Sequence, residues 1–174
     1  MKKAQAIALL QRRGASQRLL VHVELVGEAG ESIISELERL GAEIDKEFIR
    51  SGIVLHDIGK TVQSSELDRE GDLHGETGRD LLRQEGVEPR LAQVCVSHID
   101  WRQAKTVEEL VIACADKLWK GKRVADLEEL LVRRVTTDLG LDYWEVFQCM
   151  DDCFEAIADR ADERLERSRS DTVR

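Results

Sequence analysis

The chain has 174 residues, of which 42% are hydrophobic and 35% charged, and 26 lysines and arginines against 35 aspartates and glutamates give a net charge of −9. This length suits one domain, spanning residues 1–174, and is too short for two well-packed domains. A chain this acidic argues against broad binding to nucleic acid or to an anionic membrane, because both need a dominant positive field. A small phosphate ligand held by a local cationic site remains compatible with this charge.

The composition favours helix over sheet, since the chain has one proline and only 4% aromatic residues beside many helix formers. Hydrophobic periodicity and glycine positions predict the helix bounds. The expected helices cover residues 3–12, 17–40, 44–57, 75–85, 89–98, 106–119, 126–138 and 142–168. Residues 61–73 are polar and aperiodic, which predicts a loop that borders a site, and the tail 168–174 is expected to fray. We therefore expect an all-α fold.

The first residues, MKKAQAIALLQRRG, predict an amphipathic helix and not a signal peptide, because the apolar patch is short and lacks a small-residue cleavage site. No apolar run is long enough to span a membrane. Cys95, Cys114, Cys149 and Cys153 all lie in apolar runs and form no C-x-x-C pair. We expect reduced thiols in a cytoplasmic protein.

The chain has only four histidines, and each lies in or beside a predicted helix: His22, His56, His74 and His98. His22 shares a helix face with the apolar residues Leu19 and Val26, which predicts that its ring points inward. Asp116 shares a face with Ile112 and Trp119, so its carboxylate is also expected to point inward. A single inward histidine is usually a satisfied core residue, and a single inward aspartate is usually a cap or half of an ion pair.

The stretch IVLHDIGKT, residues 53–61, ends an apolar run on the ionisable residues His56, Asp57 and Lys60. Burying such groups is costly unless something pairs with them, so they either cap a helix end or hold a cation. Two inward histidines and two inward aspartates on three helices favour the cation. Together these imidazoles and carboxylates form the nitrogen and oxygen shell that suits Fe, Mn, Co, Ni or Zn; Mg is also compatible.

The order His22 … His56-Asp57 … Asp116 resembles the H…HD…D signature of the HD-domain metal-dependent phosphohydrolases. The segments RLLVHVELVGEAG, GIVLHDIGK and VIACADKLWKGKR carry the resemblance, which covers residues 17–123. It implies an HD-domain helical bundle with the metal buried between helices. Residues 126–168 would add two C-terminal helices to this HD core. The resemblance also implies that one metal is held by His22, His56, Asp57 and Asp116.

The remaining histidines extend the resemblance, in LHGETGRDLL for His74 and AQVCVSHID for His98. In HD subfamilies with two metals, histidines in these contexts hold the second ion, and the aspartate of the doublet, here Asp57, bridges both. The alternative is a single metal, with His74 and His98 contacting a phosphate or carrying protons. Ser97 precedes His98 where a His-His pair is common, which weakens the case for a second metal.

This resemblance implies cleavage of a phosphoester or phosphoanhydride of a nucleotide, or of a similar small phosphorylated substrate, by a metal-activated water. Asp57 and Lys60 are the expected catalytic residues. Lys60, Lys117 and Lys120 are candidate contacts to the substrate phosphate, although lysines near a helix C-terminus are favoured there in any case.

Departures from the family narrow the substrate. No GYP motif is present, since Pro89 is the only proline, which argues against the branch that cleaves cyclic dinucleotides. IGK follows the HD doublet in place of an acidic pair, which argues against the hydrolases of the stringent-response alarmone. The layout is similar to the small HD enzymes that split dinucleoside tetraphosphates symmetrically, but the substrate stays open. Four aromatic residues could stack on a base or pack in the core: Trp101, Trp119, Tyr143 and Trp144.

Two other classes of function use the same residues. Some HD-fold proteins are oxygenases with a di-iron pair, and others are non-catalytic modules that bind a metal or nucleotide. Degenerate modules usually lose a ligand, whereas this chain has them all. A C-terminal apolar stripe covers the core or forms a homodimer surface, and it contains Leu127, Leu130, Leu131, Val135, Val146, Phe147, Met150, Phe154 and Ile157.

Overall fold

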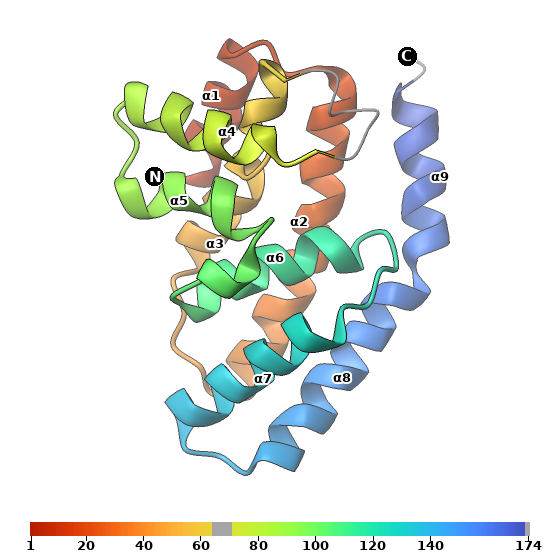
Figure 1. Ribbon diagram of the computed structural model, residues 1–174. Coiled ribbons are helices and arrows are strands. Elements are labelled where there is room, and N and C mark those ends of the chain that lie inside the picture. Colours follow the sequence, from red (N-terminus) through yellow and green to blue (C-terminus); the bar gives the residue numbers. More distant parts are fainter. Residues whose placement is uncertain (64–70, 173–174) are drawn as a thin grey trace.

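A computed structural model describes residues 1–63 and 71–172, and all regular secondary structure within these residues is helical (Figure 1). The α-helices are α1 (Lys3–Arg12), α2 (Gln17–Arg39), α3 (Lys46–Leu55), α4 (Leu73–Gln84), α5 (Pro89–Ser97), α6 (Val107–Leu118), α7 (Ala125–Leu139), α8 (Tyr143–Asp159) and α9 (Ala161–Thr172). Two short 3-10 helices, η1 (Ile58–Thr61) and η3 (Trp101–Gln103), follow α3 and α5. The all-α prediction is therefore confirmed, while most of the loop predicted at 61–73 lies outside the described residues.

Side-chain caps explain where several helices begin. The hydroxyl of Ser16 accepts a hydrogen bond from the Leu19 N–H at the start of α2, and Asp45 does the same for the Phe48 N–H at the start of α3. Thr106 caps α6 through the N–H of Glu109. Each cap satisfies a backbone donor that has no partner within its helix. The starts of α2, α3 and α6 are thus fixed locally, and these helices carry much of the site described below.

One predicted helix is wrong. Residues 142–168 form two helices, because the chain turns at Arg160 between α8 and α9, and α9 continues to Thr172 where fraying was expected. Three helices, not two, therefore follow the core. Ala161 and Leu165 continue the helical spacing of Ile157 and no glycine or proline lies between them, so the sequence pattern is unbroken. The turn allows α9 to pack along α2.

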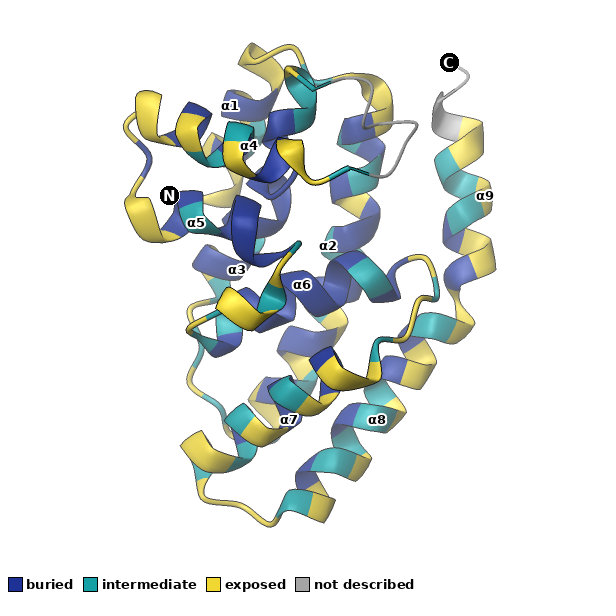
Figure 2. Cartoon of the chain, in the orientation of Figure 1, coloured by how far each residue is buried: buried dark blue, intermediate teal, exposed yellow. Residues whose placement is uncertain are grey.

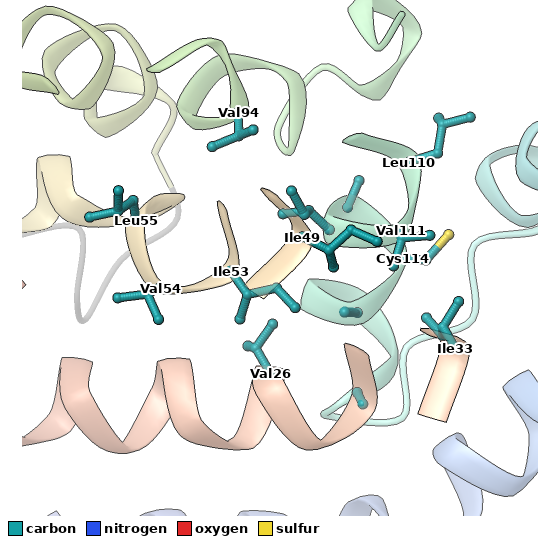
Figure 3. Close-up of a cluster of buried hydrophobic side chains, with 14 of the residues drawn as sticks. Val26, Ile33, Ile49, Ile53, Val54, Leu55, Val94, Leu110, Val111 and Cys114 are labelled. Carbon is teal, nitrogen blue, oxygen red and sulfur yellow. The ribbon is translucent and has the colours of Figure 1, made fainter. Parts of the chain in front are cut away.

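Helices α2, α3 and α6 pack against one another and form the centre of the fold, where the buried side chains gather (Figure 2). Val26, Ile53 and Val111 contribute one apolar side chain from each helix (Figure 3). Gly52 permits the close approach of α3 to α6, because a Cβ there would lie 2.4 Å from Cδ1 of Ile112. Helices α1, α4 and α5 lie at one end of this centre, and α7 and α8 lie at the other (Figure 1).

The C-terminal apolar stripe packs inside the molecule. Seven of its nine predicted members are buried, and Leu130 and Phe147 are partly buried against the same core. The stripe therefore covers the core, which is one of the two alternatives predicted for it. All four cysteines are free. In the described part of the chain, no helix is both long and apolar enough to cross a membrane.

Candidate metal centre

The six residues predicted to bind metal meet near the ends of five helices. They are His22 in the second turn of α2, His56 and Asp57 directly after α3, His74 in the first turn of α4, His98 directly after α5, and Asp116 in the last turn of α6. Five of them are buried, and the side chain of His22 is 17% exposed. His22 therefore lies on the side of the cluster that is open to solvent.

The two carboxylate oxygens of Asp57 face two different sets of donors. Oδ2 lies 3.1 Å from Nε2 of His22 and 3.5 Å from Nε2 of His56. Oδ1 lies 3.1 Å from Nε2 of His74 and 3.5 Å from Nε2 of His98. Oδ1 of Asp116 completes the first set, at 3.6 Å from His22 and 3.5 Å from His56. Asp57 therefore lies between two sets of possible metal ligands.

Backbone carbonyls orient two of the histidines. Nδ1 of His56 lies 2.7 Å from the Ile53 carbonyl oxygen, and Nδ1 of His98 lies 3.0 Å from that of Val94. A carbonyl oxygen can only accept, so Nδ1 carries the proton and Nε2 presents its lone pair to the cluster. This is how proteins orient histidines that bind metals.

The ring nitrogens of the four histidines lie close together in two pairs. Nε2 of His22 and Nε2 of His56 are 3.3 Å apart, and Nε2 of His74 and Nε2 of His98 are 3.4 Å apart. Oδ1 of Asp57 is buried and accepts no hydrogen bond of good geometry from the described residues. A buried acceptor of this kind is costly unless a cation or proton lies beside it. The donor set therefore fits divalent metal ions.

The electrostatics keep the oxygen ligands ionised. Burial alone would raise the pKa of the Asp57 carboxyl, but the electrostatic influence of the surrounding histidines, with His56 the largest, holds it well below its usual range. The pKa of Asp116 is likewise well below its usual range, because His56 and Lys117 outweigh its burial. Burial lowers the pKa of His98, which favours the neutral ring that a metal needs.

Two of the three predicted phosphate contacts touch the cluster. Nζ of Lys60 lies 2.6 Å from Oδ2 of Asp57, and Nζ of Lys117 lies 2.7 Å from Oδ2 of Asp116. Lys60 lies in η1, where residues three apart eclipse one another, so its side chain returns over Asp57. Lys120 is exposed beyond the end of α6, and none of the described ion pairs joins it to the cluster.

Residues 19–120 match the HD domain family, and this stretch contains all six clustered residues. The chain belongs to the HD-domain family. Its membership of the metal-dependent phosphohydrolase superfamily agrees with the nitrogen and oxygen donors found here. HD domains bind divalent metals, and the groups His22–His56–Asp116 and His56–Asp57–His98 each bring three ligand atoms within 4.8 Å of one another.

The chain is also similar to three archaeal proteins. It is 30% identical over 139 residues to a tRNA (cytidine(56)-2'-O)-methyltransferase of Thermoplasma volcanium, and the match covers 71% of this chain and 38% of that protein. A protein of the same description in Picrophilus torridus is 23% identical over 73% of this chain and 39% of its own length. An uncharacterized protein of Methanocaldococcus jannaschii is 26% identical over 75% of this chain and 83% of its own. The chain thus spans about two fifths of the two methyltransferases, and no solved structure matches it.

A close backbone contact places His74 in this HD domain. A Cβ on Gly59 would lie 2.0 Å from the carbonyl oxygen of His74, so η1 and the start of α4 touch through their backbones. Only glycine permits this approach. The contact places His74 beside Asp57, although 16 residues separate them along the chain.

The serine that replaces the first histidine of the common His-His pair has a structural role. Ser97 Oγ donates to the buried Glu109 carboxylate at 3.0 Å, which ties the end of α5 to α6. His98 therefore faces the cluster while Ser97 faces away from it. Sequence reasoning missed Glu109 and the two carbonyls that orient His56 and His98. The carbonyls could have been found, since a histidine directly after a helix lies near the free carbonyls of the last turn.

The aromatic residues lie in different surroundings. Trp119 is buried and packs edge-on against the ring of His22, with ring centroids 5.2 Å apart. Trp101 is half-buried, and Arg102 lies over its ring. Tyr143 and Trp144, which were also predicted to stack on a base or pack in the core, form a cluster with Phe147 at the start of α8. Of the four, Trp119 is the one whose ring touches a residue of the centre.

Proposed function

We propose that this HD domain is a metal-dependent phosphohydrolase that cleaves a phosphoester or phosphoanhydride in a small phosphorylated substrate, with nucleotides as the first class to test. The observation that carries the proposal is Asp57, whose two oxygens face two histidine pairs at 3.1–3.5 Å. A carboxylate in this position can bridge two cations. Paired divalent ions suit displacement at phosphorus, because both attacking and leaving oxygens need stabilisation.

Each half of the centre has its own ligands. His22, His56 and Asp116 would hold one ion with Oδ2 of Asp57, and His74 and His98 would hold the other with Oδ1. Bound metal supplies a hydroxide nucleophile near neutral pH and positive charge for the phosphoryl oxygens.

The chain's own residues complete the site. The carbonyls of Ile53 and Val94 keep Nε2 of His56 and of His98 directed inward, so these ligands need no rearrangement. Lys60 and Lys117 have side chains 20% and 22% exposed, and their ammonium groups lie at the edge of the cluster. There they can contact the anionic oxygens of a substrate, with Asp57 and Lys60 in the catalytic roles.

The substrate is proposed to be small. A net charge of −9 disfavours a long polyanion, because extended phosphate contacts need a matching positive surface. The names of the two methyltransferase relatives nevertheless make RNA-derived phosphates a class to include in the test. Nucleotides, dinucleoside polyphosphates and short RNAs with terminal phosphates therefore belong in one panel.

The test begins with metal content. The protein is purified without chelator beside Asp57→Ala and the control Asp80→Ala, whose side chain is exposed on α4. We expect about two transition-metal ions per chain in the wild type and in Asp80→Ala, and none in Asp57→Ala. Cleavage of each panel member is then measured with Mn, Fe(II), Co, Ni, Zn and Mg, by chromatography of the nucleotide products together with an assay of free phosphate. Metal-loaded protein that cleaves no member of the panel would refute the hydrolase.

The same experiment separates the alternatives. Tightly bound iron with oxygen uptake and no cleavage of the panel would identify a di-iron oxygenase, since nitrogen and carboxylate ligands also suit iron. Metal binding with neither reaction would indicate a binding module. The complete ligand set favours an enzyme over such a module.

A further inference from the structure

Two lysines contact the centre, and each pairs with a different kind of carboxylate oxygen. Lys117 pairs with Oδ2 of Asp116 at 2.7 Å, while the other oxygen of Asp116 faces His22 and His56. Lys117 thus holds Asp116 from the side opposite the histidines. An ammonium in that position orients the carboxylate and leaves its ligand oxygen available.

Lys60 pairs with the carboxylate oxygen that would itself bind the metal. Its Nζ lies 2.6 Å from Oδ2 of Asp57, the oxygen that also lies 3.1 Å from Nε2 of His22. A metal bound by these atoms would lie about 2.0–2.2 Å from the same oxygen. Two cations so close together repel strongly in a site of low dielectric. The ammonium of Lys60 and a metal ion therefore compete for Oδ2.

The two side chains differ in freedom to move. The side chain of Asp57 is 2% exposed, and the histidines surround it on both sides. Lys60 is 20% exposed and carries its charge on a flexible four-carbon stem. When an ion binds at Oδ2, the ammonium is therefore the group that leaves, and it leaves toward solvent.

We infer that Lys60 competes with the metal for Oδ2 of Asp57 and is displaced when the metal binds, whereas Lys117 stays in place and positions Asp116. The inference rests on the proposed metal centre and deepens it. It makes Lys60 available to an anionic substrate only after the metal has displaced it. The presence of metal thereby controls the charge that the substrate meets at this edge of the site.

The test compares Lys60→Met with Lys117→Met in the full chain. Each variant removes one positive charge beside the centre, so any general relief of repulsion toward the metal is shared by both. The affinity for the first Zn²⁺ ion is measured by competition with a chromophoric chelator. We expect Lys60→Met to bind that ion about tenfold more tightly than Lys117→Met. Lys60→Arg keeps the cation and should stay close to the wild type.

Thermal unfolding gives a second measure. Lys60→Met leaves the buried carboxylate of Asp57 without its ammonium partner, so its melting temperature without metal should fall. The rise in melting temperature on adding Zn²⁺ should then be larger for Lys60→Met than for Lys117→Met. Where Lys60→Met folds only with metal, its melting temperature without metal cannot be measured. Recovery of its helical circular dichroism on adding Zn²⁺ then takes the place of that melting temperature.

Equal affinities in the two variants, or weaker binding by Lys60→Met, would overturn the competition. A wild-type chain that binds no metal would overturn it together with the proposed centre. Metal binding with the expected order but without cleavage of any panel member would remove the hydrolase proposal and leave this inference standing. Cleavage of a panel member with equal metal affinities in the two variants would support the hydrolase and overturn this inference.

Discussion

The two halves of the centre are built differently. The half around Oδ2 of Asp57 uses His22, His56 and Asp116 from α2, α3 and α6, the helices at the centre of the fold. The half around Oδ1 uses only His74 and His98, from α4 and α5; these helices pack against each other, and α4 also packs against η1 while α5 also packs against α3 and α6. The first half has a second carboxylate and two lysines, and the second half has neither.

This difference should appear as a difference in affinity. The half around Oδ2 offers four protein ligands and the half around Oδ1 offers three, and ligands on well-packed helices lose less freedom on binding. The half around Oδ2 should therefore fill first and hold its ion more tightly. The half around Oδ1 depends on the contact of η1 with α4 and should be the more easily lost.

The largest effect should come from removing one ligand in each half. Asp116→Ala should weaken the tight ion by more than the roughly 10–100-fold that outer-shell partners cost. His98→Ala should leave the tight ion in place and remove the weak one, because His98 faces only Oδ1 of Asp57. Titration in metal buffers measures both constants. Losses of equal size at the same ion would show that the halves are not distinct.

A smaller effect should come from the backbone contact that places His74. Gly59→Ala should cost roughly 1–3 kcal/mol, since its Cβ would meet backbone atoms that cannot move aside. The same variant should lose the weaker ion and keep the tight one. Gly27→Ala on α2 is the matched control, because nothing lies within 4 Å of its Cβ. The control should gain about 0.5–1 kcal/mol in urea unfolding. A Gly59→Ala protein as stable as this control would contradict the close contact.

The smallest effect concerns the link between α2 and α3 in the first half. Arg50 donates to both oxygens of Glu31, at 2.7 and 2.8 Å, and these bonds lower the pKa of Glu31 from 4.5. A carboxyl whose pKa is lower in the folded chain stabilises the fold above its unfolded pKa, and this stabilisation is lost as the pH falls through the folded value. Glu31→Gln should thus be less stable than the wild type by under about 1 kcal/mol at pH 7.

The difference between Glu31→Gln and the wild type should vanish in acid. Urea unfolding at several pH values measures it. A difference in stability that stays constant as the pH falls below the pKa of Glu31 would assign the effect to packing and not to charge. Metal affinity should be the same in both proteins, since Glu31 lies outside the centre.

Much of the molecule could be predicted from local pattern. The helices and the convergence of four histidines and two aspartates followed from spacing and from the family signature. The break at Arg160 could not, because no glycine or proline marks it and the apolar residues Ile157, Ala161 and Leu165 keep a helical spacing through it. The choice between one and two ions also depended on which oxygen of Asp57 each histidine faces, and that is set by how distant helices pack. For the same reason, the sequence could not predict which carboxylate oxygen Lys60 and Lys117 each pair with.

The buried guanidinium of Arg164 bears on how small a working fragment of this protein can be. It donates to the carbonyl oxygen of Trp119 at 2.8 Å and to that of Ile157, which closes the ends of α6 and α8 together. Asp116 lies in that last turn of α6, three residues before Trp119. A fragment cut to the family match at 19–120 would expose this turn and uncover the apolar face that α7 and α8 protect. The shortest stretch expected to keep the six clustered residues in place therefore includes the first turn of α9, where Arg164 lies.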